Sequence, residues 1–172
     1  MKNKEADNLS NTEKTNFKLM EDRDHVRLRP GMYIPNKDYC IYELVDNGVD
    51  ILINDKNSHL YETKDICVGI DEDGVVSVSD SAGALPVAES DEIPGCTIAE
   101  LCMSRLKAGT KFEEGVKSAG LNGVGASCIN FLSEWFTVEI HNGKNIYDMN
   151  FKQGIIDQKL AQQGKTDKND KK

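Results

Sequence analysis

The stretch that decides the fold is residues 40–54, CIYELVDNGVDILIN. Its apolar residues recur at helical spacing, which predicts an amphipathic helix with one face fit for burial. Glu43, Asn47 and Asp50 lie away from that face, within an arc of roughly 60° at about 100° per residue. Their oxygen atoms can hold a hard cation and a water, and a carboxylate there can act as a general base. The alternative is a solvated polar face, the ordinary state of acidic residues on a helix.

Length, charge and cysteine content limit the class of protein. The chain has 172 residues, enough for one domain with a real core. Its net charge of -8 argues against this chain alone binding DNA or an anionic membrane. Five cysteines without a CxxC pair favour reduced thiols in a cytoplasmic protein over disulfides or a zinc site. No apolar run approaches the ~20 residues that a membrane-spanning helix needs.

The rest of the chain predicts an α+β domain. Short strands are expected around an Asp-Gly turn at residues 73–74 and an Asn-Gly turn at residues 142–143. Helices are expected between these hairpins, without the strand–helix–strand rhythm of a parallel sheet. This pattern favours a two-layer sandwich, in which a mostly antiparallel sheet carries helices on one face. The expected organisation is a flexible arm at 1–18, a folded domain at 19–154, and a charged, disordered tail at 155–172.

A second candidate site is the glycine-rich segment GLNGVG at residues 120–125, which opens a small-to-apolar helical pattern. Glycines let backbone N–H groups approach a phosphate at the positive end of a helix. The order GxxGxG is neither the GxGxxG of dinucleotide folds nor a P-loop. A turn with close helix packing explains the same glycines equally well.

Asp80 is the third candidate, because it ends a predicted strand beside a loop of small residues. A carboxylate there can accept a hydrogen bond from an exocyclic amine such as that of adenine. Taken alone, Asp80 is more simply explained as the start of a turn or as a helix cap.

In this order, the three features resemble the GHKL (Bergerat) ATPase fold. An E-x-x-x-N-x-x-D helix comes first, then a strand ending in Asp, then a glycine loop that opens a helix. The chain is most similar to the ATPase domain of bacterial type IIA DNA topoisomerases, in the gyrase B and ParE subunits. The likeness covers about residues 20–154. It is carried by VRLRPGMYI at 26–34, YELVDNGVD at 42–50, KAGTKF at 107–112, GLNGVGAS at 120–127 and LSEW at 132–135.

The resemblance implies a role for each matching position. Glu43 would be the catalytic general base that activates the attacking water, and Asn47 would coordinate Mg²⁺. Asp50 would support the polar network of the site, and Asp80 would receive the adenine amino group. The other implied nucleotide-binding residues are Leu85 and Pro86 on the base wall, Gly109 and Lys111 in a lid at 107–117, and Gly120, Leu121, Asn122, Gly123, Val124 and Gly125 around the phosphates.

The resemblance also implies a function. The chain would be the N-terminal ATPase domain of an ATP-hydrolysing DNA topoisomerase, coupling Mg-ATP binding and hydrolysis to DNA strand passage. Its implied partners are a second copy of the gyrase B-type chain in an ATP-dependent dimer, an A-type topoisomerase subunit and DNA. The second domain, which supplies a lysine to the γ-phosphate, is missing, so hydrolysis by the isolated chain is expected to be slow or absent.

Departures from the family pattern keep a second hypothesis open. In the segment DSAGALP at residues 80–86, alanines 82 and 84 stand where the family has glycines, and Gly83 replaces an arginine. After Gly154 the family continues into a strand, where this chain is expected to end in its charged tail. The alternative function is therefore a degenerate nucleotide-sensing or interaction module with weak or no ATPase activity.

Overall fold

The computed structural model describes residues 19–54, 64–81, 83–108 and 124–165. Within these ranges helices and antiparallel hairpins alternate, as the sequence predicts. The elements in chain order are α1 (Asp22–Leu28), the 3-10 helix η1 (Pro30–Met32), α2 (Lys37–Asn54), β1 (Ile66–Ile70), β2 (Val76–Asp80), α3 (Ile98–Ser104), α4 (Gly125–Leu132), β3 (Trp135–Asn142), β4 (Asn145–Lys152) and β5 (Ile155–Lys165).

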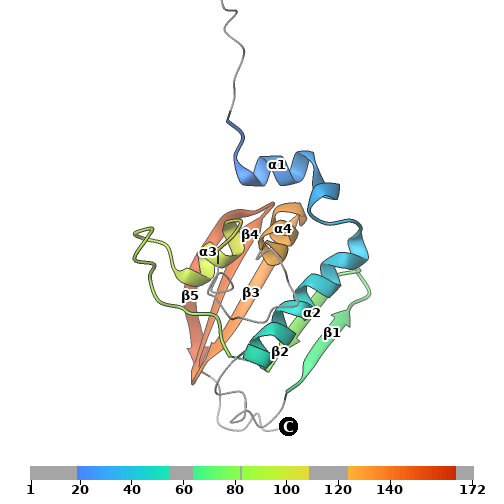
Figure 1. The fold of residues 1–172 in the computed structure, drawn as a ribbon. Helices are drawn as coiled ribbons and strands as arrows, with labels where there is room; N and C mark the ends of the chain where they lie inside the picture. The colour runs from blue at the N-terminus through green and yellow to red at the C-terminus, as the bar shows by residue number, and fades with distance from the viewer. Residues whose placement is uncertain (1–18, 55–63, 82, 109–123, 166–172) are drawn as a thin grey trace, which may run out of the picture.

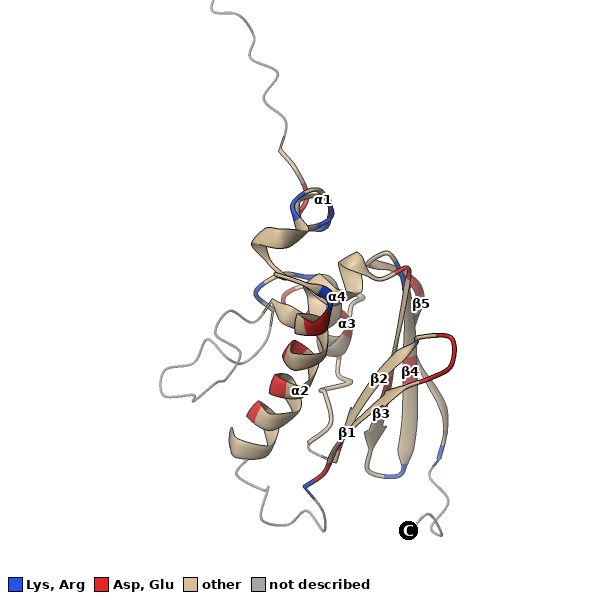
Figure 2. Cartoon of the chain, turned by 90° about the vertical axis from the view of Figure 1, so that its right-hand side faces the viewer, with Lys and Arg blue, Asp and Glu red and all other residues tan. Residues whose placement is uncertain are grey.

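The strands form two antiparallel sheets, β1-β2 and β3-β4-β5, among the described residues. Figure 1 shows the two sheets next to each other, with α2 across the hairpin and α3 and α4 across the larger sheet. In the turned view of Figure 2 these three helices lie on one side of the strands. The arrangement confirms the predicted α+β class with helices on one face, although its strands are divided between two ladders.

Polar side chains at the helix starts explain where two of the helices begin. α2 starts three residues earlier than the sequence pattern predicts, at Lys37, because the Asn36 carboxamide Oδ1 accepts a hydrogen bond from the Tyr39 backbone N–H at 3.0 Å. α3 starts with a capping box, in which Thr97 Oγ1 accepts from the Glu100 N–H at 3.2 Å. The Glu100 carboxylate in turn accepts from the Thr97 N–H at 2.7 Å.

Two apolar clusters hold the layers together. The first joins α1 and the segment after η1 to α4, and consists of Val26, Ile34, Cys128, Ile129 and Phe131. The second lies between α3 and the three-stranded sheet, and consists of Ala99, Ile140, Met149 and Phe151. Helix α1 is also tied to α4, because Arg27 donates from Nη1 to the Phe131 carbonyl at 2.6 Å.

The segment after Gly154 corrects the sequence prediction. Residues 155–165 are not part of a charged tail but form β5, which pairs antiparallel with β4. The segment is rich in Gln, Lys, Leu and Ala, which favour helix in isolation. Pairing with β4 and burial against the second cluster override that preference, since Ile156 and Leu160 pack against it. The folded domain therefore extends at least to residue 165, beyond the predicted end at 154. The predicted arm at 1–18 and residues 166–172 lie outside the described residues.

Candidate functional site

The polar stripe of α2 is only partly open to solvent. Glu43 and Asn47 are half-buried, and Asp50 is 4% exposed. All three have interaction partners in the structure. A freely solvated acidic face does not describe Asp50, so that alternative fails for at least one residue of the stripe. Figure 2 shows the acidic positions of α2 following one another along the helix.

Glu43 meets the start of α4 at Gly125. A Cβ built on Gly125, which is buried, would fall on the Glu43 carboxylate and lie 3.0 Å from its Cδ and 3.2 Å from its Cβ. The missing side chain at Gly125 therefore lets the carboxylate reach the first turn of α4. The N-terminal end of a helix carries partial positive charge, so it stabilises an anion placed there. Gly125 therefore serves close helix packing, as the alternative interpretation of the glycine-rich segment predicts. Its packing partner is Glu43, the predicted general base.

Asp80 contacts helix α2 at Gly48, about one and a half turns after Glu43. A Cβ on the buried Gly48 would lie 3.2 Å from the Asp80 Cβ and 3.2 Å from Ile66 Cδ1. Asp80 ends β2 and is exposed. Because Gly48 follows Glu43 by five residues, the two contacts lie about 7.5 Å apart along the helix axis. Helix α2 therefore brings together all three of the predicted motifs.

The predicted base wall lies in the segment between β2 and α3. Leu85 is half-buried and packs against the second apolar cluster, whereas Pro86 is exposed. The Pro86 carbonyl accepts a hydrogen bond from the Ala99 N–H in α3 at 3.1 Å. The wall is thus attached to the first turn of α3.

Two thiols lie under the site. Burial raises the pKa of the Cys128 thiol from 9.0 to about 12, and the nearby carboxylates of Glu43 and Asp22 contribute to the rise. Burial also raises the pKa of Cys40, in the first turn of α2. All five cysteines are free, as their odd number and the lack of a CxxC pair predict. These protonated thiols belong to the packing beneath Glu43 and do not serve as nucleophiles.

Six predicted site residues lie outside the described residues, and so does Ala82 of the altered loop. They are Gly109, Lys111, Gly120, Leu121, Asn122 and Gly123. Of the predicted phosphate loop, only its last two residues are described. Val124 is half-buried ahead of α4, and Gly125 begins that helix.

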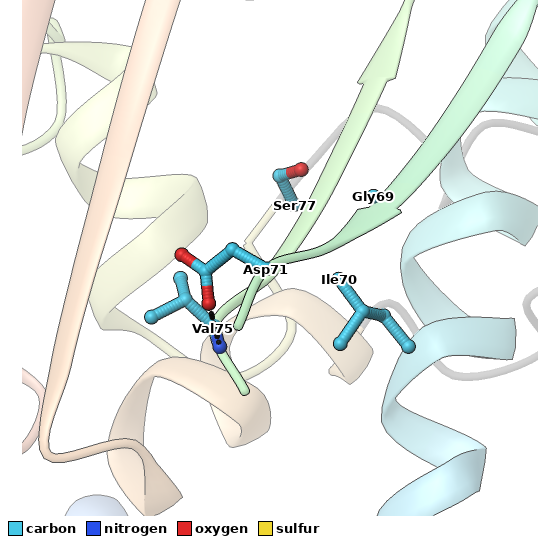
Figure 3. A pocket seen from close by; sticks show the side chains of 5 residues that line it. All are labelled: Gly69, Ile70, Asp71, Val75 and Ser77. Carbon is cyan, nitrogen blue, oxygen red and sulfur yellow. Dashed lines mark hydrogen bonds between the residues drawn. The ribbon is translucent and has the colours of Figure 1, made fainter. Parts of the chain in front are cut away.

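A small hollow at the hairpin tip holds none of the predicted site residues. It measures about 220 Å³ and is lined by Gly69, Ile70, Asp71, Val75 and Ser77 (Figure 3). The Asp71 carboxylate closes the turn by accepting from the Val75 N–H at 2.8 Å. The hollow is open and shallow, so we place the candidate site at the α2 contacts instead.

Sequence reasoning missed one polar residue near the site, Glu100. The Thr-x-x-Glu spacing of a capping box was readable at residues 97–100. Nothing in the pattern indicated that Glu100 is 2% exposed and also accepts a hydrogen bond from β5.

Within the described residues no helix is long and apolar enough to cross a membrane.

Comparison with known proteins gives clear relatives, although no family model matches the chain. The DNA gyrase B protein of Myxococcus xanthus is 40% identical over 156 residues, which cover 87% of this chain and 18% of that protein. The B subunit of DNA topoisomerase 4 from Staphylococcus epidermidis is 41% identical over 160 residues, which cover 88% of this chain and 23% of that protein. This chain therefore spans less than a quarter of the length of these relatives.

A solved structure agrees with these relatives. The 43K ATPase domain of Thermus thermophilus gyrase B, determined in complex with an aminocoumarin, superposes with a TM-score of 0.66 at 28% sequence identity. The match covers 85% of this chain and 36% of that one. Both comparisons confirm the resemblance that the sequence motifs predict.

Proposed function

This chain is a homologue, over most of its length, of the B proteins of DNA gyrase and topoisomerase IV, and we propose that it is the ATP-binding part of such a type II topoisomerase. One observation carries the proposal. Helix α2 sets Glu43 against Gly125 at the start of α4 and Gly48 against Asp80 at the end of β2. A phosphate-binding helix end and an adenine-binding carboxylate then both contact the helix that carries the general base.

In this proposal Glu43 is the catalytic residue. Its carboxylate lies at the positive end of α4, where the backbone N–H groups of the first turn are suited to hold the terminal phosphate. A water between that phosphate and Glu43 gives up a proton to the carboxylate as it attacks. The helix end stabilises the charge that builds up on the phosphate oxygens during transfer.

The purine end of the nucleotide is assigned to Asp80. Its exposed carboxylate accepts a hydrogen bond from the adenine amino group. Leu85 and Pro86 supply the apolar wall against which the base lies. The buried carboxylate of Asp50 supports the polar network on the inner side of α2. The phosphate-loop and lid residues at 109–123 complete the site in this proposal, as they do in the family.

The donor atoms on α2 fit a magnesium ion. Asn47 offers a hard carboxamide oxygen, half-buried one turn after Glu43. Mg²⁺ in nucleotide sites takes only one or two protein ligands and completes its shell with phosphates and water. In the described ranges, no group of three or more His, Cys, Asp or Glu side chains could hold a metal ion. When bound, Mg²⁺ would be held by the Asn47 carboxamide oxygen and would offset the charge of the phosphates.

The partners follow from the relatives. We assign to the complete enzyme a second copy of the B-type chain, an A-type subunit and DNA, with ATP turnover resetting strand passage in the cytoplasm. The net charge of -8 argues against this chain alone binding DNA, so the proposal assigns the DNA contacts to other parts of the enzyme. The alternative of a degenerate interaction module is not favoured, since relatives about 40% identical are topoisomerase subunits.

The proposal is tested by replacing the general base in the complete gyrase B-type protein. Glu43→Ala is expected to leave Mg-ATP binding within about twofold and to lower turnover by at least about 100-fold, the range of general-base catalysis. Asp46→Ala, a carboxylate on the same helix that the proposal does not use, is the matched control and is expected to retain turnover. Retained hydrolysis in Glu43→Ala would remove Glu43 from its assigned role.

A further inference from the structure

Glu100 is a buried acid that the proposed ATP chemistry does not use. It lies in the first turn of α3 with 2% of its surface exposed. A buried carboxylate is costly unless its oxygens are hydrogen-bonded. Both of its oxygens accept backbone N–H groups, Oε2 from Thr97 at 2.7 Å and Oε1 from Leu160 at 2.9 Å. The carboxylate thus joins the start of α3 to β5.

The helix cap accounts for only one of these two bonds. The bond to Thr97 completes the capping box, a local device that glutamine serves as well as glutamate. The bond to Leu160 reaches a strand 60 residues away in the sequence. A residue that only capped α3 would not need to be buried or to use its second oxygen.

A bulge in β5 supplies the partner of that second oxygen. Two β5 residues, Lys159 and Leu160, stand opposite one β4 residue, Met149. An extra residue of this kind is left out of the ladder, so its backbone group needs another partner. Glu100 accepts from Leu160, and Lys159 Nζ donates to the Gly95 carbonyl at 3.0 Å. Both bulge residues therefore hold the segment that leads into α3.

The start of α3 in turn holds the base wall. The Ala99 N–H donates to the Pro86 carbonyl at 3.1 Å, and the Ile98 N–H donates to the Ala88 carbonyl at 2.9 Å. Leu85 packs against the cluster that contains Ala99. A continuous set of contacts thus runs from β5 through Glu100 and α3 to the wall.

We propose that Glu100 is a positioning residue for the nucleotide base, because it fixes the base wall at Leu85 and Pro86 relative to the β5 bulge. This inference rests on the proposed function, since the wall matters only if a base lies against it. Glu100 itself touches no reacting atom. Its effect is on the affinity for the adenine end of the ligand.

The test compares two variants that both disturb the start of α3. In Glu100→Gln the side-chain amide has one acceptor oxygen and one NH₂ donor. The oxygen can accept from only one of the Thr97 and Leu160 N–H groups, and the NH₂ group faces the other, so one of the two hydrogen bonds is lost. Thr97→Ala removes the other half of the capping box and leaves the β5 bond intact. The dissociation constant for a non-hydrolysable ATP analogue with Mg²⁺ is measured on the 172-residue chain by calorimetry, and circular dichroism checks folding.

Glu100→Gln is expected to raise the dissociation constant about tenfold. The unpaired buried N–H destabilises the arrangement that holds the base wall, and binding must restore that arrangement. Thr97→Ala is expected to change it by less than about twofold, although it too weakens the helix start. Should Glu100→Gln not fold, Glu100→Asp takes its place with the same expectation, since its side chain is too short for both bonds. Equal effects of the two variants, or unchanged affinity in Glu100→Gln, would overturn the inference alone. No binding by the wild-type chain would overturn the proposed function together with it.

Discussion

The two sheets differ in how deeply their helix-facing sides are buried. On the hairpin, Val68 is 48% exposed and Ile70 is 65% exposed. On the three-stranded sheet, Met149 and Phe151 are at most 1% exposed. Of the two sheets, the larger one therefore contributes more apolar burial to the fold. The hairpin, which carries Asp80, is held mainly by α2 at Gly48. The three-stranded sheet thus contributes to stability, whereas the hairpin carries a residue of the candidate site.

The largest contrast is expected between two cysteines, one on the hairpin and one in the apolar cluster beneath Glu43. Cys67 lies exposed in β1, while Cys128 lies buried in α4. A rise in the Cys128 pKa from 9.0 to about 12 lowers its thiolate fraction near pH 8 by roughly a thousandfold. Mass spectrometry after a short pulse of iodoacetamide is expected to find Cys67 modified and Cys128 intact. Modification of both at similar rates would contradict the packing beneath Glu43.

The same thiol gives the stability a defined pH dependence. Because the folded-state pKa of Cys128 is raised, unfolding releases its proton once the pH exceeds 9.0. This contribution to the unfolding free energy is fully present below pH 9 and is lost as the pH rises toward about 12. Urea titrations between pH 8 and about pH 10.5 are expected to show a steeper loss for wild type than for Cys128→Ala. Parallel losses would contradict the assignment.

Truncating an apolar side chain is expected to lower the unfolding free energy by different amounts in the two sheets. Phe151→Ala removes a fully buried ring and is expected to lower the unfolding free energy by about 3–5 kcal/mol. Ile70→Ala, on the hairpin, is expected to lower it by no more than about 0.5 kcal/mol. Chemical denaturation measures both values. Comparable losses would show that the hairpin is as much a part of the core as the larger sheet.

A substitution at the junction between the parts is expected to affect binding more than stability. Gly125→Ala places a methyl group on the Glu43 carboxylate. Displacing the first turn of α4 from the phosphates is expected to weaken nucleotide binding about tenfold, or about 1.4 kcal/mol. Gly31→Ala, whose added Cβ meets nothing within 4 Å, is the control and is expected to bind normally. Undiminished affinity in Gly125→Ala would place the nucleotide elsewhere.

A small effect is also expected on the outer face of the larger sheet. Lys152 pairs with Asp157 at 3.0 Å, and its side chain is 70% exposed. Such an exposed pair is screened by water, so Lys152→Ala is expected to change the unfolding free energy by at most about 1 kcal/mol. A larger loss, seen by thermal denaturation at low and high salt, would mean that this face is covered by another surface.

Much of this fold could be predicted because its signals are local. The apolar spacing of α2, the Asp-Gly turn before β2 and the Asn-Gly turn after β3 each specify their element from neighbouring residues. β5 could not be predicted in the same way. Its Gln, Lys and Ala residues suit a helix, and the open edge of β4 decides the outcome only after the chain has folded.

The site was predictable to a similar extent. Glu43, Asn47 and Asp50 share a helix face by spacing alone, and the family likeness placed Asp80 and Gly125 near them. Sequence could not show that glycines at 48 and 125 make these contacts possible, because each is needed for a neighbour distant in the chain. The link from Glu100 to Leu160 was hidden for the same reason.

The most direct test of the central claim is calorimetric titration of the 172-residue chain with a non-hydrolysable ATP analogue and Mg²⁺. We expect saturable binding at one site, weakened at least about tenfold by Asp80→Asn and left nearly unchanged by Glu43→Ala. No heat at millimolar ligand, or equal affinity in Asp80→Asn, would contradict a single purine-nucleotide site built around α2.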